Sequence, residues 1–305
     1  MTNFILLIGL ILLSFLASGA NANNTKSPLK TTIVNLEKPT HGKIGVAVLN
    51  TQNQQHWSYR GNERFALMST FKTLACAKML ADSDHNILNK QQTAFIDKTK
   101  MIPWSPITEQ YIGKQMTLEK LCEAAMLNSD NTAINLVLSH IGGPMAVTKF
   151  LQQNGDFITR IDRIEPELNT AFLNDPRDTS TPLTMVNTLH KLLYGDLLSN
   201  ASKEQLKNWM MNNQVSDSLL RSILPSNLFI ADRTGAGNNG SRGISAVIWG
   251  KEKQPLIISI YLTQTTLSIQ ERDKVIVRIG ESILQKYGFI DTEEELNALN
   301  LKKEH

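Results

Sequence analysis

Several features are scarce in this sequence of 305 residues. It contains two cysteines and six histidines, and its formal net charge is only +3. The positive charges are scattered, so the chain lacks the dense basic run that is typical of nucleic-acid binding. The histidines lie at positions 41, 56, 85, 140, 190 and 305 and never cluster at the spacing of metal ligands. We therefore expect no nucleic-acid partner, no metal and no other cofactor.

Long hydrophobic runs are also scarce. Residues 4–17 form one uninterrupted apolar or small stretch, and Ala20-Asn21-Ala22 supplies a cleavage site, so residues 1–22 are predicted to be a secretory signal peptide. An uncleaved anchor is the alternative, because no Lys or Arg precedes the run. No later run is long enough to span a bilayer. We expect an exported, periplasmic monomer that is free of the membrane after cleavage near Ala22.

The two cysteines suit an oxidising compartment. Cys76 and Cys122 either form a disulfide or remain buried free thiols. A bridge between them would stabilise the fold by about 4 kcal/mol in the chain-entropy model. Export of the chain favours the bridge.

Strand patterns lie near both ends of the chain, with helical patterns between them. The predicted strands are 43–49, 55–60, 228–234, 243–249 and 256–262. The predicted helices are 69–83, 117–127, 130–140 and 268–287, with further starts at Pro144, Thr181-Pro182 and Ser202. The segment Ser27-Pro28-Leu29-Lys30 predicts a coil, because it contains a proline and lies near the N-terminus.

This order predicts an α/β (α+β) fold with two lobes. An antiparallel sheet built from both chain ends (23–66 and 213–290) would form one lobe, and an inserted all-helical segment (67–212) the other. A small-molecule site is expected in the cleft between them. Residues 161–180 carry two prolines and seven charged side chains without a period, which predicts a long functional loop. Residues 291–305 form a charged tail.

Short motifs point to a nucleophilic site. Ser69 and Lys72 are three residues apart on a predicted helix, so their Cβ atoms would lie roughly 5–6 Å apart and the ammonium could reach the hydroxyl. This is the geometry of an activated nucleophile. Alone the motif is weak, because Ser-x-x-Lys also occurs at residues 27–30.

Four further elements follow along the chain. They are Ser129-Asp130-Asn131 at a junction of two helices, Glu165 with Asn169 in the long loop, Arg233-Thr234-Gly235 on a strand, and Arg242 beside a glycine-rich turn. Glu165 and Asn169 could together hold one water. Gly235 would let a ligand approach the backbone closely. We expect Asp130 to be structural.

In their order and spacing these motifs resemble those of class A β-lactamases, over residues 40 to 287. The resemblance implies the fold of serine β-lactamases and penicillin-binding proteins, with β-lactams as substrates. It extends to the cysteine pair and to Arg163 and Asp178, which would tie the ends of the long loop together. One departure is Arg233, where the family usually has lysine. Arginine there resembles the carbenicillin-hydrolysing branch, and its planar fork could grip a carboxylate with two hydrogen bonds.

The resemblance also implies a role for each site residue. Ser69 would form an acyl-enzyme, with either Lys72 or Glu165 as the base for acylation. Ser129 would relay the proton to the lactam nitrogen, and Glu165 with Asn169 would drive deacylation. The remaining implied roles are an oxyanion hole made by the N–H groups of Ser69 and Ala236, a carboxylate site made by Arg233, Thr234, Gly235 and Arg242, and an amide contact from Asn131. Trp104 would be an aromatic wall at the cleft mouth or a core residue.

Two rival functions share the serine and the lysine. A penicillin-binding D-Ala-D-Ala peptidase and a non-hydrolysing β-lactam sensor would both be acylated and stay acylated. Glu165 and Asn169, in a loop closed by Arg163 and Asp178, distinguish a hydrolase from either, because neither rival needs a deacylating water.

Overall fold

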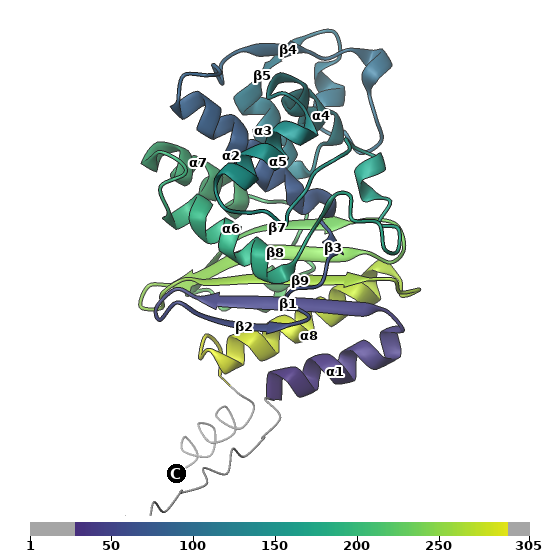
Figure 1. Cartoon of the computed structure of the whole chain (residues 1–305), viewed down its shortest axis with the longest axis vertical. Helices are drawn as coiled ribbons and strands as arrows, with labels where there is room; N and C mark the ends of the chain where they lie inside the picture. The colour runs from purple at the N-terminus through teal and green to yellow at the C-terminus, as the bar shows by residue number, and fades with distance from the viewer. Residues whose placement is uncertain (1–27, 292–305) are drawn as a thin grey trace, which may run out of the picture.

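The computed structural model describes residues 28–291, so the predicted signal peptide and nearly all of the charged tail lie outside the described residues. A five-stranded antiparallel sheet crosses the molecule in the order β2-β1-β9-β8-β7 (Figure 1). Its strands are β1 (Lys43–Asn50), β2 (Gln55–Tyr59), β7 (Leu228–Ala236), β8 (Arg242–Gly250) and β9 (Leu256–Thr263). The prediction of one sheet from both chain ends is therefore confirmed.

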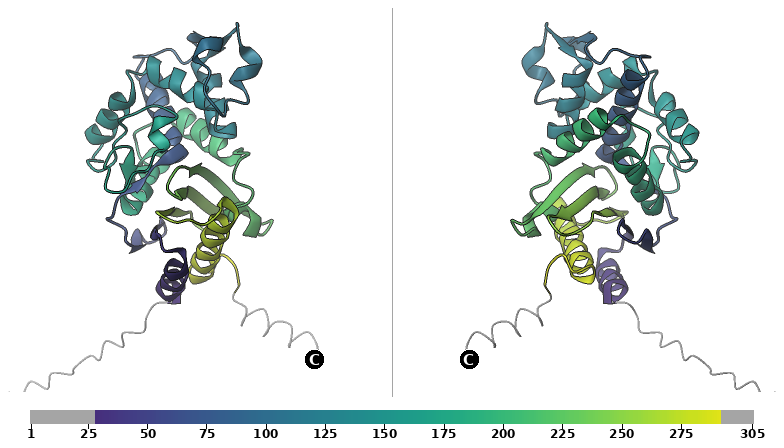
Figure 2. Two further views of the ribbon diagram at one scale, coloured as in Figure 1. Left: turned by 90° about the vertical axis from the view of Figure 1, so that its right-hand side faces the viewer. Right: turned by 90° about the vertical axis from the view of Figure 1, so that its left-hand side faces the viewer.

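Helices cover both faces of this sheet. On one face, α1 (Pro28–Thr40) and α8 (Ile269–Lys286) lie side by side, at the bottom of Figure 1 and in both views of Figure 2. The other face carries the inserted helices α2 (Phe71–Asp84), α3 (Leu118–Asn128), α4 (Asn131–His140), α5 (Pro144–Gln153), α6 (Pro182–Tyr194) and α7 (Asn200–Met211). Each face has its own apolar core. The site residues come from the boundary between the sheet and the inserted helices.

The remaining elements are short. Strand β3 (Phe65–Ala66) pairs with β6 (Thr179–Ser180), and β4 (Thr93–Phe95) pairs with β5 (Gln115–Thr117). The single-turn 3₁₀ helices are η1 (Met68–Thr70), η2 (Lys98–Lys100), η3 (Thr108–Tyr111), η4 (Glu167–Asn169) and η5 (Leu220–Ile223). The loop 161–180 contains only η4 and β6, as its irregular sequence predicts.

Capping residues explain most helix starts. The hydroxyls of Thr117 and Thr181 accept hydrogen bonds from the first turns of α3 and α6, and Ser268 forms the predicted capping box with Glu271 at α8. Such caps satisfy backbone N–H groups that have no partner inside the helix.

Two local predictions are wrong. The segment around Pro28 is the start of α1 and not a coil. Proline suits the first helical position, where its fixed φ is already helical and no N–H is needed. Helix α7 begins at Asn200 with Ser199 as its cap, so Ser202 lies within the first turn and its hydroxyl donates to Asp84.

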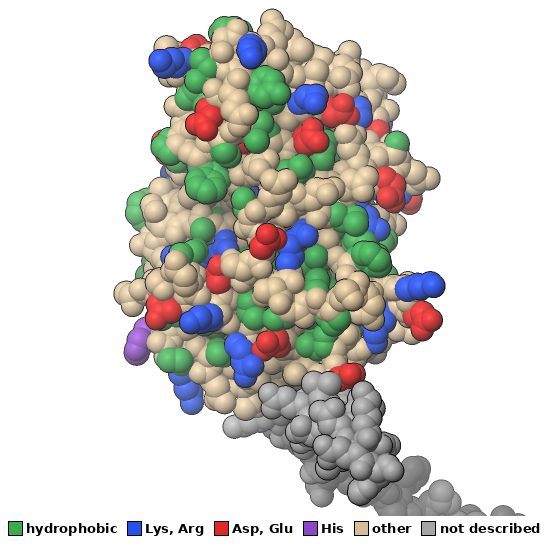
Figure 3. Space-filling view, turned by 180° about the vertical axis from the view of Figure 1, so that it is seen from behind, with side chains coloured by type: hydrophobic (Ala, Val, Ile, Leu, Met, Phe, Trp, Pro, Cys, Tyr) green, Lys and Arg blue, Asp and Glu red, His purple; other side chains and the backbone are tan. Residues whose placement is uncertain are grey.

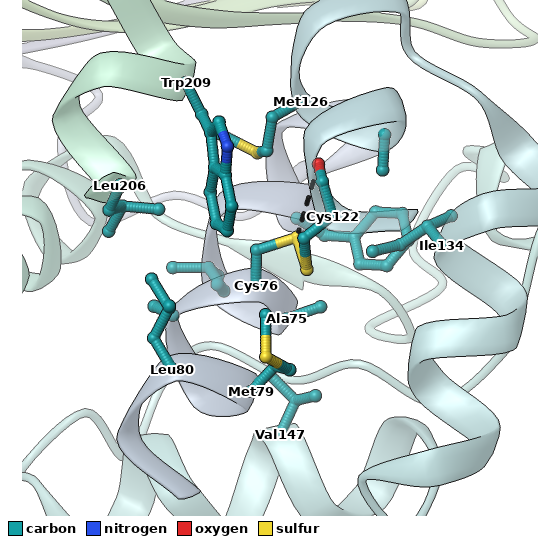
Figure 4. Close-up of a cluster of buried hydrophobic side chains, with 14 of the residues drawn as sticks. Ala75, Cys76, Met79, Leu80, Cys122, Met126, Ile134, Val147, Leu206 and Trp209 are labelled. Atoms are coloured by element: carbon teal, nitrogen blue, oxygen red, sulfur yellow. Dashed lines mark hydrogen bonds between the residues drawn. A yellow bond between two sulfur atoms is a disulfide. The ribbon is translucent and has the colours of Figure 1, made fainter. Parts of the chain in front are cut away.

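The predicted disulfide is present. Cys76 of α2 and Cys122 of α3 are joined, with Cα atoms 5.7 Å apart. The bridge lies inside the helical core, near Met79, Met126 and Trp209 (Figure 4). It therefore fixes the packing of α2, the helix that follows Ser69, against α3.

One face of the molecule shows no dominant charge. On the face shown in Figure 3, acidic and basic side chains are interspersed with small apolar groups. Between residues 28 and 291, no helix combines the length and apolar character that a membrane span needs.

Candidate active site

Ser69 lies in η1, immediately before α2, and is buried. The preceding residue, Met68, has a φ of 49°, in the left-handed region that residues with a side chain rarely adopt. This turn directs Ser69 toward the α3–α4 junction, where the hydroxyl of Ser129 donates a hydrogen bond to Ser69 Oγ at 3.1 Å. Ser129 itself has a φ of 61° at the end of α3. Two unusual backbone conformations thus bring the two hydroxyls together.

Lys72 is completely buried one turn after Ser69. Its Nζ donates to Ser129 O at 2.8 Å, Ser129 Oγ at 3.1 Å and Asn131 Oδ1 at 2.6 Å. Lys72 is therefore linked to Ser69 through the hydroxyl of Ser129. Within residues 28–291, this indirect link takes the place of the direct hydrogen bond that we expected between Lys72 and Ser69. Burial lowers the pKa of Lys72 to about 8, opposed by the charge of Glu165 and assisted by that of Arg233.

The junction of α3 and α4 also fixes Asp130 and Asn131. The Asp130 carboxylate accepts from Ala133 N at the start of α4 and from the backbone and hydroxyl of Thr108, which agrees with the structural role we expected. Asn131 donates from Nδ2 to Pro103 O at 3.0 Å. Both ends of the Asn131 amide are therefore engaged within the protein.

Glu165 extends from the long loop into the same site. Its side chain is fully buried, and Oε1 lies 3.4 Å from Lys72 Nζ. Asn169 Nδ2 donates to Glu165 Oε2, so the predicted pair forms. Asn169 Oδ1 is a buried acceptor with no hydrogen-bond partner within residues 28–291, and Glu165 Oε1 has only its ion pair with Lys72. Each of these two oxygens can still accept a hydrogen bond from water.

The backbone at Glu165 is held by a residue that sequence reasoning missed. Asn135 of α4 accepts from Glu165 N at 3.0 Å and donates to Glu165 O at 2.8 Å. A lone asparagine on a helix gives no signal in the sequence, because its partner lies in a distant loop.

The ends of the loop are tied as predicted. Arg163 Nε donates to Asp178 Oδ2 at 2.5 Å, and Asp178 Oδ1 accepts from the backbone N–H groups of Asp162 and Arg163. Asp162 returns the contact by accepting from Asp178 N, a further link that the sequence did not indicate.

The segment Arg233–Gly235 belongs to β7. A Cβ on Gly235 would lie 2.7 Å from Ser69 N, so glycine is required for close packing of this strand against the nucleophile turn. We expected a ligand to approach the backbone at Gly235, but the group that lies closest to it is the turn that carries Ser69. The next residue, Ala236, ends β7 with an exposed side chain beside this turn.

Thr234 and Arg242 form a polar pair across β7 and β8. Thr234 Oγ1 accepts from Arg242 Nη1 at 2.8 Å and donates to Gly243 O at 2.9 Å. Arg242 Nε donates to Asp273 Oδ1 of α8 at 2.6 Å, and sequence reasoning missed this Asp273 anchor. A positive charge and a hydroxyl are thereby fixed side by side.

Arg233 differs most from expectation. Its side chain is 0% exposed, and its one side-chain hydrogen bond within the described chain runs from Nη1 to Asn213 Oδ1 at 3.4 Å. Burial lowers the pKa of Arg233 to about 10. The predicted direct grip on a carboxylate is not available here, because the guanidinium lies beneath the surface.

Trp104 is 64% exposed, which excludes the alternative of a core residue. Its Nε1 donates to Asn128 O at 3.1 Å, and its carbonyl accepts from Asn131 N at 2.9 Å. The ring thus lies at the surface beside Asn131. Over the described residues, no group of three or more His, Cys, Asp or Glu side chains is placed to hold a metal ion.

Comparisons with known proteins agree with one another. Residues 28–287 match the model of the β-lactamase enzyme family. β-Lactamase CARB-3 of Pseudomonas aeruginosa is 50% identical over 252 residues, which cover 83% of this chain and 88% of the relative. The crystal structure of the chromosome-encoded β-lactamase of Vibrio parahaemolyticus is 56% identical, with a TM-score of 0.84 over 85% of this chain and 98% of that one. An ancestral class A β-lactamase, GNCA, is 43% identical with a TM-score of 0.83, over 85% of this chain and 100% of that one.

Proposed function

Because this chain belongs to the class A family of serine β-lactamases, we propose that it hydrolyses penicillins, including carbenicillin, and some cephalosporins through an acyl-enzyme on Ser69. Such an activity would confer resistance to these drugs. The observation that carries the proposal is the buried chain of polar groups from Ser69 through Ser129 and Lys72 to Glu165. In this chain the nucleophile, the proton relay and both candidate bases are each within one contact of the next.

Acylation begins with attack of Ser69 Oγ on the lactam carbonyl carbon. The two 3.1 Å contacts of Ser129 Oγ favour Lys72 as the base, since the Ser69 proton can pass through this hydroxyl to a neutral amine. With a pKa of about 8, roughly a tenth of Lys72 is neutral at pH 7. The same path returns the proton to the lactam nitrogen as the C–N bond breaks. Water-mediated transfer to Glu165 is the alternative route.

Charge on the carbonyl oxygen would be stabilised by backbone donors. The N–H groups of Ser69 and Ala236 come from η1 and the end of β7, which pack directly together at Gly235. Such donors contribute about 3–4 kcal/mol each to acyl transfer.

Deacylation uses Glu165 and Asn169. A water that donates to Glu165 Oε1 and Asn169 Oδ1 would satisfy the unpartnered Asn169 oxygen and be held next to a carboxylate able to take its proton. That carboxylate and its amide separate a hydrolase from the two rival functions, a D-Ala-D-Ala peptidase and a β-lactam sensor.

The substrate carboxylate would bind at Thr234 and Arg242. Arg233 adds positive charge from beneath the surface, and charge at this depth is weakly screened. Asn131 would contact the substrate's side-chain amide, and Trp104 would line the entrance of the cleft.

We further propose that the protein is exported to the periplasm as a monomer. The signal-like segment 1–22 and the disulfide support this proposal. Mass analysis of the chain recovered from a bacterial periplasm should give an N-terminus near Asn23, whereas an uncleaved anchor would leave the full chain in the membrane fraction. Light scattering tests the monomer.

Steady-state assays test the proposed activity. The purified chain should turn over benzylpenicillin, carbenicillin and a chromogenic cephalosporin continuously. A single burst equal to the enzyme concentration, with no further product, would instead identify a penicillin-binding protein or a sensor.

A further inference from the structure

Arg233 is a buried cation whose hydrogen-bond donors are largely unused. Its Nε and Nη2 have no hydrogen-bond partner within residues 28–291, and Nη1 makes only the long contact to Asn213. Leaving a buried donor unpaired is costly, and the cost is greater for a charged group. A partner for these donors must therefore exist in the folded protein.

That partner is internal. Nε and Nη2 are sealed from solvent, so a carboxylate in the cleft cannot touch them in this conformation. The nearest carboxylate in sequence, Asp232, is engaged with Arg221 at 2.6 Å and with Asn213. The buried Glu165 carboxylate, whose charge also acts on Arg233, is engaged with Lys72 and Asn169. The remaining candidates are therefore neutral polar groups beneath the cleft.

The sheet register shows which groups these are. Arg233 of β7 is paired with Ser245 of β8, and Ser245 is paired with Ser259 of β9. Directly opposed side chains share one face of a sheet, with Cβ atoms about 4.5–5.5 Å apart. We call Arg233, Ser245 and Ser259 the polar row.

The polar row lies beneath the nucleophile turn. Two residues along each strand in one direction are Ala231, Val247 and Ile257, which belong to the helical core. In the other direction are Gly235 and Gly243, against which Met68 packs, and Tyr261, whose hydroxyl lies 3.2 Å from that of Thr70. Since side chains on one face recur every two residues, the row lies between that apolar core and the turn that carries Ser69.

The serine hydroxyls match the unused donors. Both serines are 0% exposed, and both hydroxyl oxygens, like the two arginine nitrogens, have no hydrogen-bond partner within residues 28–291. Buried polar groups that are too far apart to bond directly are commonly joined by ordered water, which makes about three hydrogen bonds. Four unpartnered polar atoms in one row of a sheet meet that requirement.

We propose that Ser245 and Ser259 are positioning residues that hold the Arg233 guanidinium in place through buried water. The polar row would fix the position of the Arg233 guanidinium beneath Thr234 and Arg242. That position would in turn determine the affinity for the substrate carboxylate. This inference deepens the proposed function. Only its predicted effect on substrate binding depends on that function. Ser245 and Ser259 touch no substrate.

The test exploits the equal shape of threonine and valine. Ser245→Thr keeps the hydroxyl and Ser245→Val replaces it with a methyl group, so the two variants match in shape and differ in the polarity and hydrogen bonding of one group. Relative to Ser245→Thr, Ser245→Val should raise KM for benzylpenicillin about tenfold with little change in kcat, and lower Tm by several degrees. Ser259→Thr and Ser259→Val should repeat the pattern.

The same pair in an Arg233→Lys background is the matched control. Lysine has a methylene where arginine has Nε, so the threonine–valine difference should shrink to less than about twofold in KM. If the threonine and valine variants differ in KM by the same factor in both backgrounds, the proposal is overturned, because the serines would then act independently of Arg233.

A crystal structure of the wild-type protein gives a readout that needs neither activity nor a variant that folds. Ordered water should lie within about 3 Å of Arg233 Nε or Nη2 and of a serine Oγ in the row. Close-packed side chains with no such water, or a guanidinium that contacts the serines directly, would contradict the proposal. The crystal structure and the Tm comparison stand even if no penicillin is hydrolysed, so they separate this inference from the proposed function.

Discussion

The ammonium of Lys72 lies 3.4 Å from the carboxylate of Glu165, and both side chains are completely buried. Removing two opposite charges from water is costly, and their attraction repays that cost only when other hydrogen bonds complete the site. Here Lys72 donates further hydrogen bonds to Ser129 and Asn131, and Glu165 accepts one from Asn169. The pair therefore links the group proposed for acylation to the group proposed for deacylation.

Glu165→Gln should separate the two steps. The variant should acylate and then hydrolyse the acyl-enzyme about 10²–10⁴-fold more slowly, the contribution typical of a general base. The carboxylate charge raises the pKa of Lys72, so removing it should shift that pKa below 8. If neutral Lys72 is the acylation base, the pH at which the acylation rate is half-maximal falls in the variant. Stopped-flow acylation rates between pH 6 and 10 measure the shift, and a large loss of acylation at every pH would favour Glu165 as the base.

Arg233→Lys should alter substrate preference. The charge is retained but its reach and planar geometry change, so the ratio of kcat/KM for carbenicillin to that for benzylpenicillin should fall, by about threefold or more. Assays of both substrates on one enzyme preparation measure the ratio. An unchanged ratio would mean that Arg233 does not contribute to carbenicillin hydrolysis.

Asp178→Ala should loosen the loop 161–180. The substitution leaves the backbone N–H groups of Asp162 and Arg163, and the Arg163 guanidinium, without their acceptor. Unfolding free energy should fall by about 3 kcal/mol, and hydrogen exchange should accelerate within the loop. Deacylation should slow more than acylation, since the loop carries Glu165. Arg177→Ala, which removes a half-exposed side chain from the same loop, is the control and should have little effect on either step.

Removal of the disulfide should destabilise the protein without abolishing catalysis. The bridge closes a loop with a sequence separation of 46 residues, which is worth about 4 kcal/mol in the chain-entropy model. Urea unfolding of Cys76→Ala/Cys122→Ala should show most of this loss. Activity at low temperature should persist, because both cysteines lie in the helical core. Loss of activity in a folded variant would contradict this view.

The sheet, the helix starts and the site motifs were predictable because each has a local cause. The capping hydroxyls of Thr117 and Ser268 act within one helical turn, and the apolar strands alternate or run continuously in ways that the sequence displays. The coil prediction at Pro28 was wrong because proline disrupts the interior of a helix but is favoured at its first position. The packing of α1 against α8 decides between these two outcomes, and the local sequence does not show that packing.

The connections within the site were not predictable in the same way. Spacing placed Lys72 near Ser69, but the left-handed backbone at Ser129 gives Lys72 its actual partner. The burial of Arg233 likewise depends on neighbours from distant segments, such as Asn213. The supporting roles of Asn135 and Asp273 arise only when the loop 161–180 and α8 are in place.

The most direct test of the central claim is the mass of the protein after brief mixing with benzylpenicillin. We expect Glu165→Gln to accumulate one covalently bound penicillin on the peptide that contains Ser69, while the wild type returns to its free mass as product forms. Ser69→Ala should bind none and hydrolyse none. Steady hydrolysis by Ser69→Ala, or an adduct on any other residue, would contradict the proposed acyl-enzyme mechanism.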